Sequence, residues 1–279
     1  MEAYQVNQPS TEKKYLFTKD RYRIYYEKTS VKNPKSSVAM VHGLSCNLTV
    51  WEQYAPHFLE QGYSTIAFDL RGHGKSDKNV EVSFKKSAYD LNQLLEKESI
   101  KDVILVANCF GVGVALKFYE IYPEKVNKMV FITPTFVNPL KYRKNLSRLT
   151  RIFYKALKTS LKYAKVKEKD YPYSNHNRDK KSRCLTLYLK NFNDNPIRTH
   201  LACFYQLIIQ DDSRVLPKIK VPTLIIAAEK DHYTPLQISK DMGKMIPDSE
   251  LIIVKNMDHA MMIRTPEKIS GLIMQFLKK

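Results

Sequence analysis

Long apolar runs and a secretion signal are both missing from this 279-residue sequence. No apolar stretch approaches the roughly 20 residues that a membrane-spanning helix requires. The first residues, MEAYQVNQPSTEKKYLF, lack the charged segment followed by an apolar one that marks a signal peptide. We therefore expect a cytoplasmic protein, with enough chain for one large α/β domain and an insertion or for two modest domains.

Sequence patterns for metals, cofactors and nucleic acids are missing as well. The four cysteines, Cys46, Cys109, Cys184 and Cys203, are scattered without metal-ligand spacing, which predicts free thiols rather than disulfides. The stretch NCFGVG lacks the first glycine and the later acidic residue of a dinucleotide-binding fingerprint. No helix-turn-helix, zinc or aromatic-basic pattern is found. We expect no metal, no cofactor and no nucleic-acid partner.

Positive charge is abundant and unevenly distributed. The formal net charge is +18, and the segment 138–218 holds 19 Lys and Arg against 6 Asp and Glu. Within it, residues 145–165 (NLSRLTRIFYKALKTSLKYAK) have apolar residues at helical spacing between flanking basic ones. Such a helix fits a lid that packs its apolar face on the main domain. The alternatives are contact with an anionic membrane or partner, and attraction of anionic substrates.

Strand and helix patterns alternate along most of the chain, which predicts a mainly parallel sheet covered by helices. An opening hairpin and then short apolar, β-branched runs lie at 15–28, 37–43, 63–69, 102–108, 128–134, 223–229 and 250–256. Helical patterns lie between them at 49–62, 83–99, 110–124, 235–246 and 266–279. The alternation stops after TPTF and resumes at VPTLIIAAE. We therefore expect an α/β core at 1–137 and 219–279, with a helical lid inserted at 138–218.

The stretch VANCFGVG, residues 106–113, has the pattern of a strand that enters a sharp turn and then a helix. A turn of the form small-x-nucleophile-x-Gly strains the nucleophile's backbone, and small neighbours let the strand and the helix approach closely. Ala107 and Gly111 flank Cys109 at these positions. A helix N-terminus stabilises a thiolate and offers N–H groups to an oxyanion. Cys109 is therefore a candidate nucleophile.

Other stretches that follow predicted strands strengthen this hypothesis. VAMVHGLSCN ends a strand at His42, and the N–H of Leu44 is a candidate oxyanion donor. AAEKDHYTP places Asp231 just after a late strand, and NMDHAMMIRTPEKI places His259 just after the next. The order nucleophile, acid, histidine is that of hydrolases with a nucleophile elbow.

With these motifs, the chain resembles the α/β-hydrolase superfamily, and in particular its lid-bearing, esterase-like and epoxide-hydrolase-like members. The resemblance extends from about Tyr15 to the end and is weakest in the lid. It implies an eight-stranded-type, mainly parallel sheet with helices on both faces. It also implies a catalytic triad and an oxyanion hole, and we carry these over to Cys109, Asp231 and His259 (triad) and to the backbone N–H groups of Leu44 and Phe110 (oxyanion hole).

The sequence departs from the family's pattern at the elbow. Ala107 replaces the first glycine, Asn108 stands where histidine is frequent, and Val112 stands where glycine is common. These three changes concern packing, whereas the cysteine at 109 concerns the reaction itself. Cysteine at this position is similar to dienelactone hydrolases and polyhydroxyalkanoate synthases.

Each site residue also has a structural interpretation. Cys109 can be a packing thiol in a chain that has lost activity, or a serine replacement. Asp231 can be a turn residue, since EKDHYTP is turn-like, and His259 can be a loop histidine. Asp69 and Arg71, in the predicted turn FDLRGHGKSD, are interpreted as structural because a buried charge requires a partner.

A thiolate is a good leaving group, which restricts the acyl substrates it can turn over. We expect hydrolysis of activated esters or thioesters through an acyl-cysteine intermediate. The alternatives are an acyltransferase that passes the acyl group to an alcohol or amine, and a catalytically silent binding protein or serine-to-cysteine variant of a serine esterase. The basic segment favours an anionic acyl donor such as acyl-CoA, acyl carrier protein or lipid.

Overall fold

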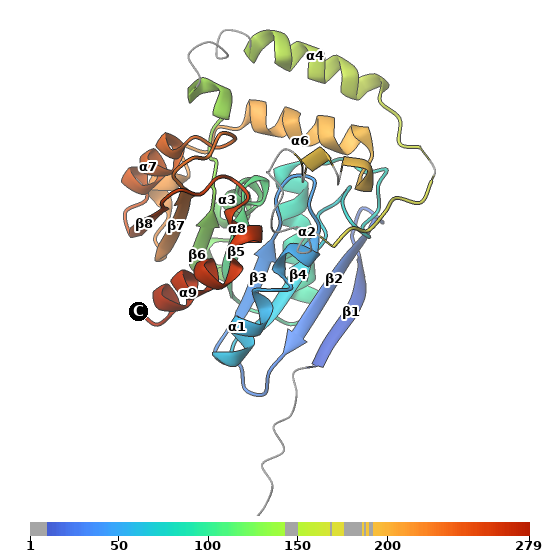
Figure 1. Cartoon of the computed structure of the whole chain (residues 1–279). Coiled ribbons are helices and arrows are strands. Elements are labelled where there is room, and N and C mark those ends of the chain that lie inside the picture. The colour runs from blue at the N-terminus through green and yellow to red at the C-terminus, as the bar shows by residue number, and fades with distance from the viewer. Residues whose placement is uncertain (1–9, 143–149, 168, 176–185, 187, 190–191) are drawn as a thin grey trace, which may run out of the picture.

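A single eight-stranded sheet forms the centre of the protein in a computed structural model (Figure 1). The structure describes residues 10–142, 150–167, 169–175, 186, 188–189 and 192–279, so Cys184 and the beginning of the predicted basic helix at 145–149 lie outside the described residues. The strands are β1 Ser10–Phe17, β2 Arg23–Ser30, β3 Ser37–Val41, β4 Ser64–Phe68, β5 Val103–Asn108, β6 Val126–Ile132, β7 Thr223–Ala228 and β8 Ser249–Val254.

The spatial order of the strands is β1-β2-β4-β3-β5-β6-β7-β8. β1 pairs with β2 and β2 with β4 in antiparallel fashion, and all pairs from β4 to β8 are parallel. Each predicted strand region contains a strand, and the predicted α/β class with a mainly parallel sheet is confirmed. Because the carboxyl ends of parallel strands share one edge, the loops after β3, β5, β7 and β8 are brought to the same side.

Helices cover both faces of the sheet: α1 Ala55–Glu60, α2 Phe84–Lys97, α3 Phe110–Ile121, α7 Leu236–Met245, α8 Met261–Arg264 and α9 Pro266–Leu277. Side chains alternate between the two faces along a strand. Thus Leu105 of β5 packs in the apolar cluster that contains residues of α2, α3 and α7. Its neighbours Ile104 and Val106 pack in a second cluster, with residues of α1, α8 and α9. The strands are apolar along their length because both faces are buried.

The predicted helix at 49–62 is two shorter elements. A 3₁₀ turn, η1 Leu48–Trp51, is capped by Asn47, whose side chain accepts a hydrogen bond from the N–H of Thr49. The α-helix α1 starts only at Ala55, with Pro56 in its first turn. Proline has no N–H to donate to the preceding turn, so the helical pattern is interrupted before it.

Between β6 and β7 the described chain forms η3 Pro139–Tyr142, α4 Thr150–Tyr163, η5 Phe192–Asp194, α6 Ile197–Ile209 and η6 Leu216–Lys218. α6 lies over the sheet edge that carries the turns after β3 and β4, and α4 lies on the outer side of α6 (Figure 1). The division into a core and a lid at 138–218 stays a prediction. Among the described residues, no helix is both long enough and apolar enough to span a membrane.

Candidate active site

Cys109 occupies the junction between β5 and α3. Its backbone has φ 49° and ψ −112°, a left-handed conformation that is unfavourable for a residue with a side chain. The surrounding hydrogen bonds hold it there: the N–H of Cys109 donates to the carbonyl of Ile132 at 3.0 Å, and its own carbonyl accepts from Val112 at 3.0 Å. Strained residues of this kind cluster at functional sites, where the surrounding structure overcomes the cost.

Close approach of α3 to the end of β3 explains the small residues of the elbow. A Cβ atom added to Gly111 would lie 2.6 Å from the carbonyl oxygen of Val41 and 2.7 Å from that of His42. These are backbone atoms, so a side chain at 111 would force the helix away from the sheet. Ala107, by contrast, is fully buried on the strand side with its methyl group accommodated. The replacement of the first glycine is therefore compatible with this turn.

Asn108, the second departure at the elbow, connects β5 to the end of the neighbouring strand. Its amide Nδ2 donates to the carbonyl of Ile132 at 3.2 Å and to Oγ1 of Thr133 at 3.0 Å. Thr133 has a positive φ of 44°. The carbonyl of Thr133 in turn accepts from Oγ1 of Thr234 at 3.3 Å. Asn108 thus joins the nucleophile turn to the loop after β7.

The structure brings Asp231 and His259 together. Asp231 follows β7 and His259 follows β8, and Nδ1 of His259 lies 2.7 Å from Oδ2 of Asp231. The carboxylate is fixed from its other side as well: Oδ1 accepts from the N–H groups of Tyr233 and Thr234, both at 2.8 Å, and Oδ2 accepts from Oγ1 of Thr234 at 2.8 Å. With so many donors, Asp231 holds the imidazole ring in one orientation.

Electrostatics couple His259 to both neighbours. Burial disfavours the charged imidazole, but the Asp231 carboxylate, and then Cys109 through its charge and a side-chain hydrogen bond, raise the pKa of His259 well above its ordinary value. Burial likewise acts against the charged form of Asp231, but the charge of His259 and the hydrogen bonds outweigh it, so the pKa of Asp231 is lowered. His259 is therefore hydrogen-bonded to Asp231 and lies close enough to Cys109 for the two groups to influence each other electrostatically.

The candidate oxyanion donors come from two different segments, the start of α3 and the loop after β3. Phe110 is the first residue of α3, where helix N–H groups have no partner within the helix. Leu44 follows Gly43, and a Cβ atom on Gly43 would lie 2.7 Å from Oδ1 of Asn108 and 3.4 Å from Cβ of Cys109. The loop after β3 therefore touches the elbow, and Leu44 packs against the same apolar cluster as Cys109.

A buried serine–histidine pair holds this loop and was not identified from the sequence. Ser45 has a positive φ of 60° and is 3% exposed. Nδ1 of His200, in α6, lies 2.8 Å from its Oγ, and Nε2 of His200 lies 2.9 Å from the carbonyl of Phe192. That carbonyl can only accept, so the ring proton is on Nε2 and Ser45 donates to Nδ1. Burial lowers the pKa of His200, which favours this neutral form. No sequence signal connects residues 155 positions apart.

The two charged residues of the turn after β4 have the partners that the structural interpretation requires. Arg71, 1% exposed, donates to Oδ1 and Oδ2 of Asp90 at 2.6 and 2.7 Å. Asp69 is fully buried and accepts from the N–H groups of Leu48 and Lys75, both at 2.7 Å. Burial raises the pKa of Asp69 to about 7.

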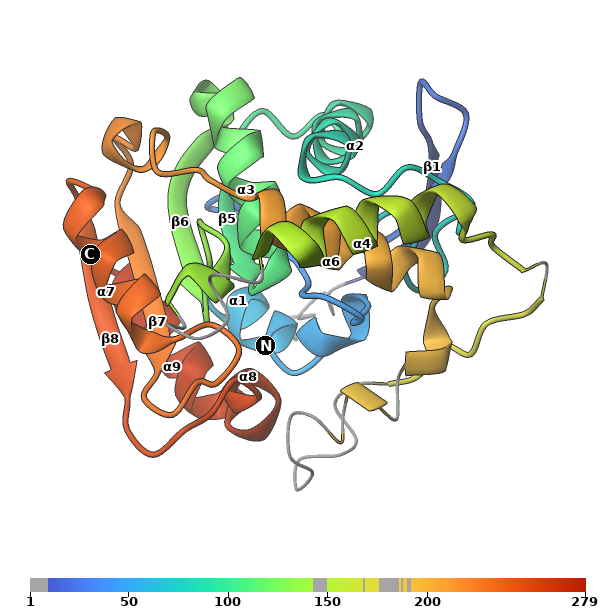
Figure 2. The ribbon, with the colours of Figure 1, turned by 90° about the horizontal axis from the view of Figure 1, so that it is seen from above.

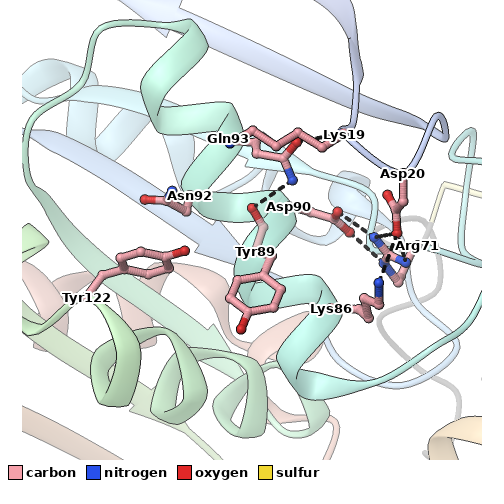
Figure 3. A pocket seen from close by; sticks show the side chains of 9 residues that line it. All are labelled: Lys19, Asp20, Arg71, Lys86, Tyr89, Asp90, Asn92, Gln93 and Tyr122. Carbon is pink, nitrogen blue, oxygen red and sulfur yellow. Dashed lines mark hydrogen bonds and ion pairs between the residues drawn. The ribbon is translucent and has the colours of Figure 1, made fainter.

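The Arg71–Asp90 pair also borders a pocket between α2, the β1–β2 turn and the end of α3 (Figure 3). Its lining consists of Lys19, Asp20, Arg71, Lys86, Tyr89, Asp90, Asn92, Gln93 and Tyr122. None of the predicted site residues is among them. Asp20 pairs with Arg71 and Lys86, each at 3.4 Å, so these opposite charges satisfy one another. We interpret this pocket as part of the scaffold. In the described part of the chain, no group of three or more His, Cys, Asp or Glu is arranged to hold a metal ion.

Known proteins are similar to this chain in sequence or in fold. Mouse ABHD8 is 22% identical over 257 residues, which cover 89% of this chain but only 57% of ABHD8. The chain thus spans little more than half the length of that relative. The AB hydrolase superfamily protein YisY of Bacillus subtilis is 24% identical, with 94% of this chain and 98% of YisY covered. Among solved structures, the esterase EaEST from Exiguobacterium antarcticum superposes with a TM-score of 0.74 at 21% identity, covering 96% of this chain and all of EaEST.

The family itself follows from the match over most of the chain. Residues 37–266 match the family described as alpha/beta hydrolase fold. This span begins at β3 and includes the elbow, the loops after β7 and β8 and the whole segment between β6 and β7. The protein therefore belongs to the alpha/beta hydrolase fold family.

Proposed function

We propose that this protein hydrolyses activated carboxylic esters or thioesters through an acyl intermediate on Cys109. The observation that carries the proposal is the strained Cys109 at the elbow beside His259, whose Nδ1 lies 2.7 Å from Oδ2 of Asp231. A nucleophile, a base in contact with it and a third group that orients the base are the parts that nucleophilic acyl transfer requires. The esterase name of the structural relative EaEST agrees with this chemistry.

In the proposed first step, the sulfur of Cys109 forms a bond to the acyl carbon. The proton of the thiol resides on His259, whose imidazolium is stabilised by Asp231. The carbonyl oxygen becomes an oxyanion, which the N–H groups of Leu44 and Phe110 stabilise. When the tetrahedral intermediate collapses, the bond to the leaving group breaks, and His259 donates its proton to that group.

In the second step, water replaces the leaving group. His259, now neutral, accepts a proton from water as the water oxygen attacks the acyl carbon. The carbon–sulfur bond then breaks and the carboxylic acid leaves, while the proton on His259 again compensates the thiolate. Each step is an addition followed by an elimination, and no oxidant or metal takes part in the proposed cycle.

The leaving group determines which substrates the thiol can use. A tetrahedral intermediate expels its better leaving group, and a thiolate leaves more readily than an alkoxide. With an ordinary alkyl ester the intermediate therefore returns to substrate. Thioesters, aryl or enol esters and lactones have leaving groups good enough to compete. We therefore propose these acyl compounds as the substrate class.

Intact-mass spectrometry after mixing with acyl thioesters and aryl esters tests the proposal. We expect the mass of one acyl group to be added to the protein and then lost on hydrolysis. Cys109→Ala should abolish both the adduct and turnover. Cys46→Ala is the matched control, because it removes another partly buried thiol from the adjacent loop, and it should retain the adduct. Undiminished turnover by Cys109→Ala would overturn the mechanism.

Two variations separate the proposal from its alternatives. If the adduct persists in water and disappears only when an alcohol or amine is added, the protein is an acyltransferase. If Cys109→Ser is far more active than the wild type on every ester, the site is that of a serine esterase. The absence of both adduct and turnover across the panel would indicate a binding protein.

A further inference from the structure

We propose that the outward face of α4 binds anionic lipid surfaces. We define this outer face by four exposed residues, Ile152, Ala156, Thr159 and Tyr163, with the exposed Lys155, Lys158 and Lys162 beside them. The inference does not depend on the proposed nucleophile, because it concerns where the protein resides rather than which bond it cleaves.

The inner face of α4 is already occupied. Leu157 and Leu161 are partly buried, and the ring of Tyr154 stacks on that of Tyr205 in α6, with centroids 5.5 Å apart and planes at 29°. Packing on α6 therefore accounts for one apolar stripe of the helix. It does not account for large apolar side chains on the opposite side.

The outer face has such side chains in a line. Positions 152, 156, 159 and 163 are separated by four, three and four residues, so they lie on one side of the helix. Ile152 is 64% exposed and Tyr163 is 70% exposed. An aliphatic and an aromatic side chain thus stand at the two ends of a stripe whose middle is small, and both remain in contact with water in the isolated chain.

Lysines accompany this stripe along one flank. Lys155, Lys158 and Lys162 are spaced by three and four residues and are all exposed. The Nζ of Lys162 lies 5.6 Å from the centre of the Tyr163 ring. Apolar and aromatic groups next to lysines are the composition of helices that lie in the headgroup region of a bilayer. The lysine stems cover apolar surface while their ammonium groups reach the lipid phosphates.

The shape of this region favours a bilayer over a protein partner. α4 is the outermost layer at its end of the molecule and crosses above α6 (Figures 1 and 2). A single exposed helix presents a convex ridge, which a fluid surface accommodates without a complementary groove. The net charge of +18 adds a long-range attraction toward anionic headgroups. The lysines therefore indicate a negatively charged partner, and the convex shape of the helix indicates a partner whose surface can deform around it.

Co-sedimentation with vesicles tests this inference on the full chain. We expect binding to phosphatidylcholine vesicles that contain about one-third phosphatidylserine, weakening as salt is added, and much weaker binding to phosphatidylcholine alone. The triple variant K155E/K158E/K162E should bind anionic vesicles at least about 100-fold more weakly, since each lysine near such a surface contributes about a factor of five. Ile152→Ser with Tyr163→Ser should weaken binding about tenfold at unchanged charge.

A matched control distinguishes the outer face from bulk charge. K240E/K255E/K268E makes the same charge change at three exposed lysines of α7, α9 and the β8 end, and it should retain most of the binding. Equal losses in the two triple variants would overturn the proposal, as would equal binding of the wild type to neutral and anionic vesicles. The proposal would also be overturned if the protein failed to bind vesicles but bound an acidic carrier protein through α4. Thermal melting of each variant verifies that it is folded.

Discussion

Near the carboxyl edge of the sheet, Arg71 and Asp231 are buried and each is held by a specific partner, whereas the lysines of α4 are exposed. Arg71 is 1% exposed and held by both oxygens of Asp90. The lysines of α4 face solvent at every described position. A buried charge is expensive unless a partner compensates it, so each one in the sheet region specifies a neighbour. An exposed lysine changes the free energy of folding little, so a helix surface can carry many lysines without constraining the fold.

The largest effect should follow from altering the buried carboxylate at the candidate site. In Asp231→Asn, Oδ1 can still accept from Tyr233 and Thr234, so the loop should stay folded. The new amide would then direct its N–H at Nδ1 of His259, where two donors repel. We expect kcat/KM on an aryl ester to fall about 10³- to 10⁴-fold. The exposed Asp248→Asn is the control, and a comparable rate in both variants would exclude Asp231 as the acid.

The contrast in charge burial predicts a difference in stability. Asp90→Ala removes the bidentate carboxylate partner of the buried Arg71 and leaves it Asp20 at 3.4 Å and the carbonyl of Glu81 at 3.2 Å, so the free energy of unfolding should fall by about 3–5 kcal/mol. Lys155→Ala on α4 should change it by less than about 0.5 kcal/mol. Urea denaturation measures both. An equal loss of stability in the two variants would mean that the buried Arg71–Asp90 pair stabilises the fold no more than an exposed lysine does.

Two glycines allow a similar comparison between a tightly packed position and an open one. Gly111→Ala places a methyl group 2.6 Å from the carbonyl oxygen of Val41, so we expect about 1–3 kcal/mol of destabilisation. Gly271, in α9, has nothing within 4 Å of an added Cβ atom. Gly271→Ala should therefore raise stability by up to about 1 kcal/mol through helix propensity. A neutral Gly111→Ala would mean that α3 can move away from β3 at no cost.

The smallest effect is the dependence of activity on salt. If the basic segment attracts an anionic acyl donor, kcat/KM for a phosphate-bearing thioester should fall severalfold as salt is added, since the Debye length is already about 10 Å at 0.1 M. A neutral aryl ester measured beside it should barely respond. If both substrates show the same salt dependence, the basic segment does not attract the acyl donor, and its lysines retain only the lipid-binding role proposed for α4.

The amino-acid sequence alone determined the sheet and the positions of the candidate site residues. Buried parallel strands must be apolar on both faces, so each appears as a short β-branched run between helical patterns. Small residues on both sides of Cys109 marked the elbow, and chain order placed Asp231 and His259 after the last two strands. These are local signals, and for that reason they can be found without coordinates. The roles of the three residues stay predictions.

Tertiary structure alone decided which distant polar groups meet. Nothing in the sequence pairs Ser45 with His200 or Arg71 with Asp90, because their contacts arise only when α6 and α2 pack on the sheet. The break before α1 was missed because the apolar spacing of 49–62 suits one helix as well as two, although Pro56 is a sequence signal for it. Hydrophobic periodicity records which face is buried, but the partner of a buried polar group is set by topology, and burying a polar group without a partner costs free energy.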